Sequence, residues 1–284
     1  MTLRQALTLA TEQLAASPHL RDRGHRDAEL LLLHLLGLDR ATLLAHPDRS
    51  LTSEQLALYQ AAITRRLGCE PIQYITGQQE FFGLQLKVTP ATLIPRPETE
   101  HLVEAVLDRL PRDQPLKILD IGTGTGAIAL ALAAHLRLAR VTALDLSAEA
   151  LEVARQNAAA HHLTGCVHFL LSDLLTGLPQ KDRTGAFDAI VSNPPYIPES
   201  DRDGLHPEVR DYEPAQALFS GGLGLDIYRR LIPQAHAALN PGGLLALEIG
   251  HGQKEALADL LGNWRNVGFI ADLQQIPRVA LAQK

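Results

Sequence analysis

The chain has 284 residues, a formal net charge of -6 at pH 7 and 20% charged residues. This length allows one large domain and a small one, and the negative charge argues against a protein that grips nucleic acid over a large basic surface. The longest apolar run, around residues 30–36, is interrupted by His34 and flanked by charges, so we expect no membrane-spanning segment. The sequence therefore predicts a soluble, cytoplasmic protein whose partner is a basic protein rather than nucleic acid or a membrane.

Cysteine and histidine usage gives no sign of a metal centre. Cys69 and Cys166 are the only cysteines, and their spacing fits neither a metal site nor a redox motif. The twelve histidines also lack ligand spacing. The N-terminus has no signal-peptide core, so we expect two reduced thiols and no bound metal.

Residues 1–75 read as helices only. Thr2 with Gln5 has the pattern of a capping box at the start of a first helix. A second, strongly apolar helix is expected over 26–36. Thr52 with Gln55 opens another helix, which should stop at Gly68. The pattern predicts a small helical domain over 1–75.

The next segment, residues 76–96, is expected to join this domain to the rest of the chain. Leu84, Leu86 and Val88 alternate with polar residues after Gly83, which is typical of a hairpin, although a plain linker is the alternative. A helix over 98–110 then leads into a large domain that we place at 97–284.

The stretch 116–136 has the order strand, glycine loop, helix. Gly122, Gly124 and Gly126 permit a tight turn and a close approach of the backbone to a ligand at the helix N-terminus. Their spacing differs from the dinucleotide-binding pattern, and Asp120 stands immediately before them. A carboxylate there repels a pyrophosphate but suits the ammonium group of an amino-acid-like ligand, reached directly or through water. A simple strand-to-helix turn is the alternative.

Two further strands end in acidic residues. A strand over 141–144 ends at Asp145, which can accept the two hydroxyls of a ribose or serve only as a second cap for the helix that Ser147 begins. The strand over 167–171 leads to Asp173 and Leu174, which can accept an adenine amino group and cover the adenine ring. In a parallel sheet these strand ends share one crevice.

The strand over 187–192 runs into Asn193, Pro194, Pro195 and Tyr196. This tetrapeptide suits the methylation of a planar nitrogen, whose delocalised lone pair makes it a poor nucleophile. The Asn193 side-chain oxygen can accept one N–H and the Pro194 carbonyl the other. Successive prolines lack N–H groups and keep the turn from closing into a helix, and Tyr196 offers a flat face for stacking. A strand end broken by prolines is the alternative.

After this motif the sequence predicts the remaining elements of an α/β domain. A helix over 226–239 precedes a turn at 240–243, and a strand over 244–249 follows. A helix over 252–262 comes before two final strands, at 267–273 and 278–282.

Together these motifs resemble a known family. The glycine loop and Asp145 look like those of class I methyltransferases that depend on S-adenosylmethionine, and the Asn-Pro-Pro-Tyr motif looks like the subgroup that acts on planar nitrogens. The peptide chain release factor glutamine N5-methyltransferases are resembled most, through residues 70–77, 93–100, 212–214 and 248–250. The stretch Pro95-Arg96-Pro97-Glu98-Thr99-Glu100 is the most specific of these.

The resemblance implies a Rossmann-like parallel sheet with a reversed C-terminal strand, S-adenosylmethionine as methyl donor and S-adenosylhomocysteine as product. It implies that the substrate is the glutamine of the Gly-Gly-Gln loop in class 1 release factors, recognised in part by the helical domain of a monomeric enzyme. It adds Thr123, Thr125 and Leu146 to the expected cofactor contacts, and it implies that residues 193–196 both bind the substrate and carry the catalysis.

One departure and several alternatives remain. Leu223 stands where the family often has an aspartate, which puts a helix-cap or substrate role of that aspartate in doubt. The alternatives are a ribosomal-protein glutamine methyltransferase, an adenine N6-methyltransferase acting on nucleic acid, and a binding module without enzymatic activity. The first alternative would lack the Pro-Glu-Thr-Glu run, and the second should carry a basic recognition region that is not evident in this sequence.

Overall fold

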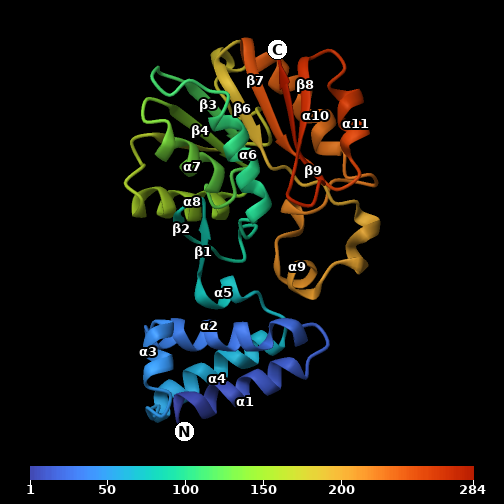
Figure 1. Ribbon diagram of the computed structural model, residues 1–284. Helices are drawn as coiled ribbons and strands as arrows, with labels where there is room; N and C mark the ends of the chain where they lie inside the picture. Colours follow the sequence, from blue (N-terminus) through green and yellow to red (C-terminus); the bar gives the residue numbers. More distant parts are fainter. The chain divides into compact units, whose positions relative to one another are not determined.

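A computed structural model describes residues 1–284, which form two compact units (Figure 1). The helical unit comprises Met1–Gln78 together with Gly204–Tyr212, and the sheet unit comprises Gln79–Asp203 together with Glu213–Lys284. The chain therefore leaves the sheet unit after the Asn-Pro-Pro-Tyr motif, enters the helical unit a second time, and returns. No helix is long and apolar enough to cross a membrane.

The helical unit is built from helices whose apolar faces meet in one core. Figure 1 shows α1, α2 and α4 lying alongside one another. Both expected capping boxes are present, at Thr2 with Gln5 and at Thr52 with Gln55, so these two helix starts are confirmed. The helices are α1 (Leu3–Ala15), η1 (Arg21–Arg23), α2 (Gly24–Leu36), α3 (Arg40–Ala45), α4 (Ser53–Leu67) and α5 (Ile72–Thr76).

A buried arginine attaches the returning segment, which contains α9 (Pro207–Tyr212), to the other helices of this unit. Arg66 of α4 is 1% exposed and donates to Asp27 of α2 at 2.7 Å. It also forms an ion pair with Glu208 of α9. Tyr212 donates through its hydroxyl to the carbonyl oxygen of Gly68 at 2.7 Å. Because a buried charge is costly unless it is paired, these contacts hold the segment in place.

The expected hairpin is present and forms a separate two-stranded sheet of β1 (Gln78–Phe81) and β2 (Leu84–Lys87). Asn157 connects the end of the hairpin to the glycine loop. Its side chain accepts from the backbone N–H of Lys87 at 2.7 Å and donates to the carbonyl oxygen of Thr125 at 2.9 Å.

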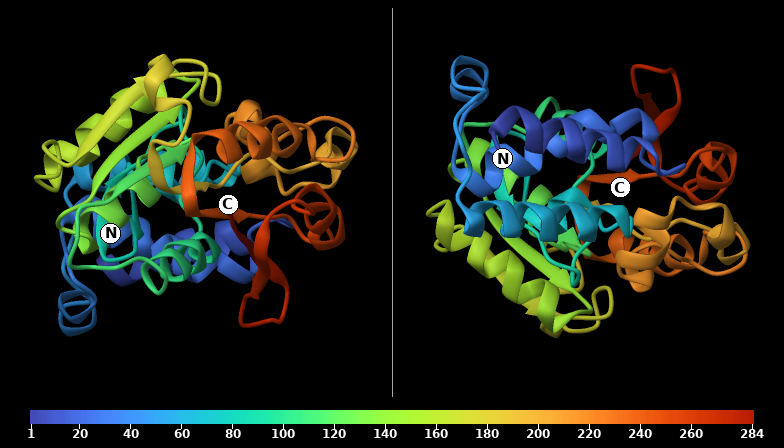
Figure 2. Two further views of the ribbon diagram at one scale, coloured as in Figure 1. Left: turned by 90° about the horizontal axis from the view of Figure 1, so that it is seen from above. Right: turned by 90° about the horizontal axis from the view of Figure 1, so that it is seen from below.

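The main sheet has seven strands in the order β5-β4-β3-β6-β7-β9-β8. All pairs from β5 to β7 are parallel, and β9 runs antiparallel to both of its neighbours, so the reversed C-terminal strand is confirmed. Figure 2 gives two further views in which the twist of the strands can be followed. The strands are β3 (Lys117–Ile121), β4 (Arg140–Asp145), β5 (Val167–Leu171), β6 (Phe187–Ser192), β7 (Leu239–Glu248), β8 (Arg265–Ala271) and β9 (Pro277–Gln283).

Helices cover both faces of this sheet, and each face has its own apolar core. One core packs β3, β4 and β6 side chains against α6 (Pro97–Leu107), α7 (Ala127–His135) and α8 (Ala148–Ala160). The other core packs the opposite face against α10 (Asp226–Ala238) and α11 (Lys254–Leu260). The short helices η2 (Gln180–Asp182), η3 (Glu199–Gly204) and η4 (Ala215–Ala217) lie in the connecting loops.

The strand register brings the chemically distinctive residues to one edge of the sheet. Ser192, the last residue of β6, pairs with Ile121 at the end of β3 and with Leu247 near the end of β7. The residues that follow these three are Asn193, Gly122 and Glu248. Parallel strands therefore deliver all of them to the same carboxyl edge, where open α/β sheets bind their ligands.

One expectation needs correction, and one doubtful position can be described. The turn expected at 240–243 lies inside β7, where the pairing jumps from Leu239 opposite Phe187 to Leu244 opposite Ala189, so these residues form an irregularity within the strand. The N-cap residue of α10 is Leu225, which provides no side-chain cap, and the hydroxyl of Ser220 accepts from the backbone N–H of Ile227 at 3.0 Å in the first turn of this helix. Leu223 itself is 65% exposed.

Candidate active site

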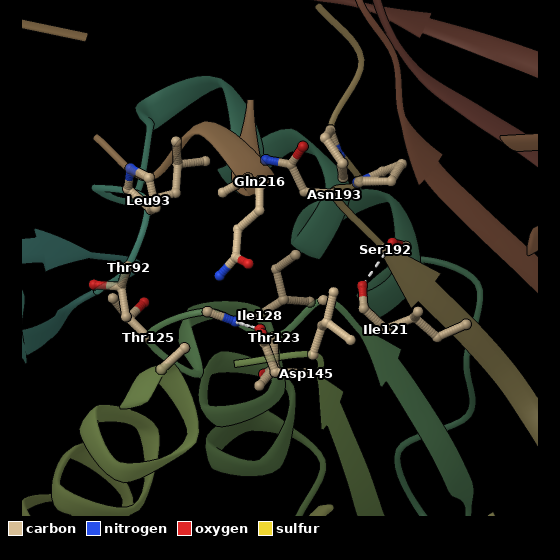
Figure 3. A pocket seen from close by; sticks show the side chains of 18 of the residues that line it. Thr92, Leu93, Ile121, Thr123, Thr125, Ile128, Asp145, Ser192, Asn193 and Gln216 are labelled. Carbon is tan, nitrogen blue, oxygen red and sulfur yellow. Dashed lines mark hydrogen bonds between the residues drawn. The ribbon is translucent and has the colours of Figure 1, made fainter. Parts of the chain in front are cut away.

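A pocket lies at the carboxyl edge of the parallel strands (Figure 3). Most of the residues expected at the site line this pocket, whereas Asp120, Gly126 and Tyr196 do not form part of its wall. The expected residues that line it are Gly122, Thr123, Gly124, Thr125, Asp145, Leu146, Asp173, Leu174, Asn193, Pro194 and Pro195.

The glycine loop between β3 and α7 has the backbone conformation that its sequence predicts. Positive φ angles are found at Gly122, Gly124 and Gly126, with values of 74°, 56° and 83°. Residues with a Cβ atom adopt such angles only under strain. The backbone N–H groups of Gly122 and Thr123 donate to the carbonyl oxygen of Leu144 at 2.8 and 2.9 Å. The loop is therefore fastened to the end of β4.

Asp120 lies beneath this loop and is completely buried. Its Oδ2 accepts from the hydroxyl of Thr123 at 2.6 Å, whereas Oδ1 is buried without a hydrogen-bond partner. Burial raises the pKa of Asp120 to about 7. A buried carboxylate oxygen without a hydrogen-bond partner costs free energy. A cationic ligand or a water molecule can supply the missing donor.

Asp145 makes the contacts of a second helix cap, one of the two roles that the sequence left open, and its ribose role stays a prediction. Its Oδ2 accepts from the backbone N–H of Gly124 at 2.8 Å, and its Oδ1 accepts from that of Ser147 at 2.9 Å. Burial is the main cause that raises the pKa of Asp145. Ser147 caps α8 by accepting from the N–H of Ala150 at 3.1 Å. Asp145 thus braces the loop and still has lone pairs on a side chain that lines the pocket.

The adenine-side residues are placed differently from one another. Leu174 is buried, has a positive φ of 50° and lines the pocket. Asp173 also lines the pocket, but its Oδ2 forms an ion pair with Arg230 of α10 at 2.6 Å. This contact leaves Oδ1 of Asp173 as the oxygen for a ligand.

Asn193 is held by a residue of α6, which a residue of β7 holds in turn. Its Nδ2 donates to the hydroxyl of Thr99, in the first turn of α6, at 3.1 Å. Thr99 in turn donates to Oε2 of Glu248 at 2.6 Å. Burial raises the pKa of Glu248 to about 7, and the hydrogen bonds from Thr99 and Tyr196 act against that rise.

Tyr196 is half-buried and fixed on three sides. Its hydroxyl donates to Oε1 of Glu248 at 3.3 Å, and its carbonyl oxygen accepts from the side chain of Gln253 at 2.9 Å. A Cβ on Gly250 would lie 2.9 Å from its ring, and a Cβ on Gly224 would overlap its carbonyl oxygen. Two glycines therefore leave the space that Tyr196 occupies, and the expected stacking of a substrate on this ring stays a prediction.

Two family models match this chain, one in each part. Residues 5–77 match the PrmC N-terminal domain, and residues 99–207 match the methyltransferase small domain. Residues 5–77 lie within the helical unit, while most of 99–207 lies within the sheet unit.

Full-length relatives decide the family. The chain is 46% identical over 288 residues to a release factor glutamine methyltransferase of Koribacter versatilis, covering 100% of this chain and 99% of the relative. It is 47% identical over 287 residues to the protein of the same name in Moorella thermoacetica, with the same coverage. The chain belongs to the release factor glutamine methyltransferase family. A methyltransferase from Pyrococcus furiosus shares the fold, with 21% identity, a TM-score of 0.52 and coverage of 79% of this chain and 97% of that one.

In this member of the release factor glutamine methyltransferase family, the structure adds residues to which the sequence assigned no role. Thr99 contacts Asn193 and in turn donates to Glu248. Gln216 extends its side chain into the pocket (Figure 3). Glu213, 5% exposed, forms an ion pair with Arg96 and accepts from the backbone N–H of Ile94 at 3.2 Å. Glu213 thereby fixes the segment 94–96, which borders the pocket.

A sequence signal existed for Glu248 but not for Gln216. Glu248 ends an apolar strand, as Asp145 does, so the rule for strand ends could have included it. Thr99 lies in the family-specific stretch, where it reads only as a helix residue near a proline start. Gln216 reaches the pocket from a loop whose course no local pattern predicts.

Proposed function

We propose that this protein transfers a methyl group from S-adenosylmethionine to the side-chain amide nitrogen of the glutamine in the Gly-Gly-Gln motif of class 1 peptide chain release factors. The observation that carries the proposal is the placement of Asn193. Its carboxamide lines the pocket at the same sheet edge as the glycine loop and Asp145, and it is oriented by Thr99. Family membership and the names of the full-length relatives support the same activity.

The residues present fit S-adenosylmethionine. The partnerless Oδ1 of Asp120 calls for a donor. Because Asp120 lies behind the pocket wall, the ammonium group of the cofactor would interact with it through water. Asp145 would accept from the ribose, while Oδ1 of Asp173 and the side chain of Leu174 would serve the adenine. Leu146, Thr123 and Thr125 complete the wall around the cofactor. When bound, the cofactor supplies a methyl group on a positively charged sulfur.

The chain contributes positioning to the reaction. The substrate amide donates one N–H to Oδ1 of Asn193 and the other to the carbonyl oxygen of Pro194, while Pro195 and Tyr196 shape the turn that presents them. Holding both N–H groups leaves the nitrogen lone pair directed at the methyl donor, and such orientation supplies much of the rate enhancement. No base is needed before transfer, because the nitrogen becomes acidic only once it is methylated. The methylated nitrogen would then release one proton to water, and S-adenosylhomocysteine would leave as the other product.

The helical unit is the part of the chain best suited to recognise the release factor. A lone glutamine offers few contacts, so discrimination among exposed glutamines needs a surface outside the pocket. The proposal therefore includes a partner that is a class 1 release factor, contacted by a monomeric enzyme without direct nucleic-acid binding. Because release factors act in translation, the proposal places the enzyme in the cytoplasm.

The experiment is incubation of the purified chain with S-adenosylmethionine and a peptide containing Gly-Gly-Gln, followed by tandem mass spectrometry. The proposal predicts the added mass of one methyl group on the glutamine side chain. A matched peptide with Gly-Gly-Asn, whose amide is one methylene shorter, serves as the control and should gain far less. No methyl on either peptide or on intact release factor would contradict the proposal.

A further inference from the structure

A buried chain of hydrogen bonds connects three residues that the sequence places far apart. Glu248, at the end of β7, is 2% exposed and accepts from Thr99 at 2.6 Å. Thr99, 4% exposed, accepts from Nδ2 of Asn193 at 3.1 Å. The direction of donation runs from Asn193 through Thr99 to Glu248.

The number of protons available in this series of hydrogen bonds determines the orientation of the Asn193 carboxamide. A threonine hydroxyl has a single proton, and here that proton goes to the carboxylate of Glu248, which as an anion can only accept. The Thr99 oxygen is then able only to accept from Asn193, so the NH2 branch of the Asn193 carboxamide must face Thr99. The oxygen branch is forced to the other side, where the substrate N–H has to be received.

We infer that Glu248 and Thr99 are positioning residues that fix the carboxamide of Asn193 in the one orientation that presents Oδ1 to the substrate. This inference rests on the proposed function, because only an amide or amine substrate needs an acceptor at that point. Without these hydrogen bonds, the carboxamide of Asn193 can rotate by a half-turn. It then presents an NH2 group to the substrate N–H, and the two donors repel each other.

The surroundings of Glu248 favour this role over a structural one. Its carboxylate has hydrogen-bond donors in Thr99 and Tyr196, and Arg278, the nearby cation, is engaged by Asp272 at 2.9 Å. Burying a carboxylate costs more than burying an apolar residue of the same size. A side chain retained only for packing would have no use for this charge, whereas a one-directional acceptor requires it.

Three variants separate orientation from packing. Glu248→Gln keeps the size of the side chain but adds an NH2 group, which can donate to Thr99 and reverse the direction of donation among the three residues. Thr99→Val keeps the shape and removes the hydroxyl, and Thr99→Ser restores it. Tyr228→Phe is the matched control, since Tyr228 donates at 2.7 Å to the backbone carbonyl of Glu248 and not to its carboxylate.

Each variant is assayed for kcat and KM with the Gly-Gly-Gln peptide, for S-adenosylhomocysteine affinity by calorimetry, and for thermal unfolding. We expect Glu248→Gln and Thr99→Val to lower kcat by about tenfold to a hundredfold, the range for lost positioning of a stabilising hydrogen bond. Cofactor affinity should stay within about twofold. Thr99→Ser should recover most of kcat, and Tyr228→Phe should keep it even if it lowers the unfolding temperature.

The outcomes distinguish this inference from the proposed function. If wild-type enzyme methylates the peptide while Glu248→Gln and Thr99→Val keep their kcat, the positioning role is wrong and the proposed function stands. If kcat falls in all variants, Tyr228→Phe included, in proportion to lost stability, Glu248 is structural and the inference fails. If the wild type methylates neither peptide nor release factor, the proposed function itself fails.

Discussion

The side-chain nitrogen of Asn193 lies 3.1 Å from the hydroxyl of Thr99, a residue 94 positions earlier in the chain. This contact joins the Asn-Pro-Pro-Tyr motif to the first turn of α6 and, through Glu248, to the end of β7. In the proposed mechanism, the side chain that receives one N–H of the substrate is thus oriented before the substrate arrives, and preorganisation of this kind is where such a site gains its rate.

Replacing Asn193 should separate methyl transfer from cofactor binding. Asn193→Ala removes one of two acceptors for the substrate amide, and loss of such a hydrogen bond costs on the order of 3 kcal/mol, or about a hundredfold in rate. Calorimetry should show S-adenosylhomocysteine still bound. Asn240→Ala is the matched control, because Asn240 donates to Asp188 away from the pocket and its loss should spare the rate. Near-wild-type turnover by Asn193→Ala would mean that the mechanism is wrong.

Replacing Asp145 should weaken cofactor binding. Asp145→Ala loses the acceptor for the ribose, and hydrogen bonds to a charged group are worth about 1.5 to 3 kcal/mol. Calorimetry with S-adenosylhomocysteine measures the change. Ser147→Ala removes the cap of α8 but no ribose acceptor, so its affinity should change little. Equal losses in the two variants, or none in Asp145→Ala, would return Asp145 to the role of a helix cap and loop brace.

The pH dependence of the rate should reflect two buried carboxyls. Burial raises the pKa of Glu248 to about 7 and that of Asp120 to about 7. The active form of each is the carboxylate, so activity should fall as the pH drops through this region. Glu98, Arg278 and Tyr196 also face Glu248.

Two kinetic parameters distinguish these carboxyls. At saturating cofactor, kcat should follow Glu248 alone, because a bound ammonium keeps Asp120 ionised. The ratio kcat/KM for S-adenosylmethionine should fall more steeply with acidity, since it includes Asp120 of the free enzyme. Glu248→Gln should make kcat nearly independent of pH, whereas kcat/KM for S-adenosylmethionine should still fall with acidity because of Asp120. A kcat that is independent of pH from 6 to 8 in the wild type would contradict the assignment.

The loop before α10 offers a sharp test of how Tyr196 is held. Gly224 has a φ of 69°, and a Cβ there would overlap the carbonyl oxygen of Tyr196, so Gly224→Ala should displace the motif. Displacements of about 1 Å can cost on the order of a hundredfold in rate. Gly222→Ala, two residues earlier, meets nothing within 4 Å and is the control. Equal kcat values for the two variants would show that the position of Tyr196 does not matter.

The recognition role of the helical unit is tested by comparing two substrates. Deleting residues up to Leu67 should lower methylation of intact release factor far more than methylation of a short Gly-Gly-Gln peptide, with cofactor binding still measurable. The deletion also removes Arg66, the partner of Glu208, so some loss on both substrates is expected. Glu208→Gln in the full chain provides the control, because it weakens the ion pairs of Glu208 with Arg66 and Arg23 without removing any helix, and it should affect both substrates alike. Equal losses in the deletion would leave the unit structural.

Local patterns predict much of this fold because they report local physics. Capping boxes at Thr2 and Thr52, glycines with positive φ in the loop after β3, and the alternation around Gly83 all involve neighbours in sequence. The sequence predicts a turn where the irregularity at 240–243 lies, because Asn-Pro-Gly-Gly indicates a turn equally well inside a strand or before it.

The site is less predictable because its contacts are long-range. The sequence places Asp145 and Asn193 at strand ends, and the pocket includes both. It does not show that Arg230 engages Asp173, that Asp120 lies behind the pocket wall, or that Thr99 links Asn193 to Glu248. These contacts depend on how α6 and α10 pack on the sheet, and no local sequence pattern predicts that packing.

The most direct test of the proposed function is transfer of label from S-adenosylmethionine to four acceptors offered separately. These are a purified class 1 release factor, the same factor with its Gly-Gly-Gln glutamine substituted, a ribosomal protein, and DNA. Labelling of the first alone, lost in the substituted factor, is the predicted result. Equal labelling of both release factors, or preferential labelling of the ribosomal protein or DNA, would contradict it.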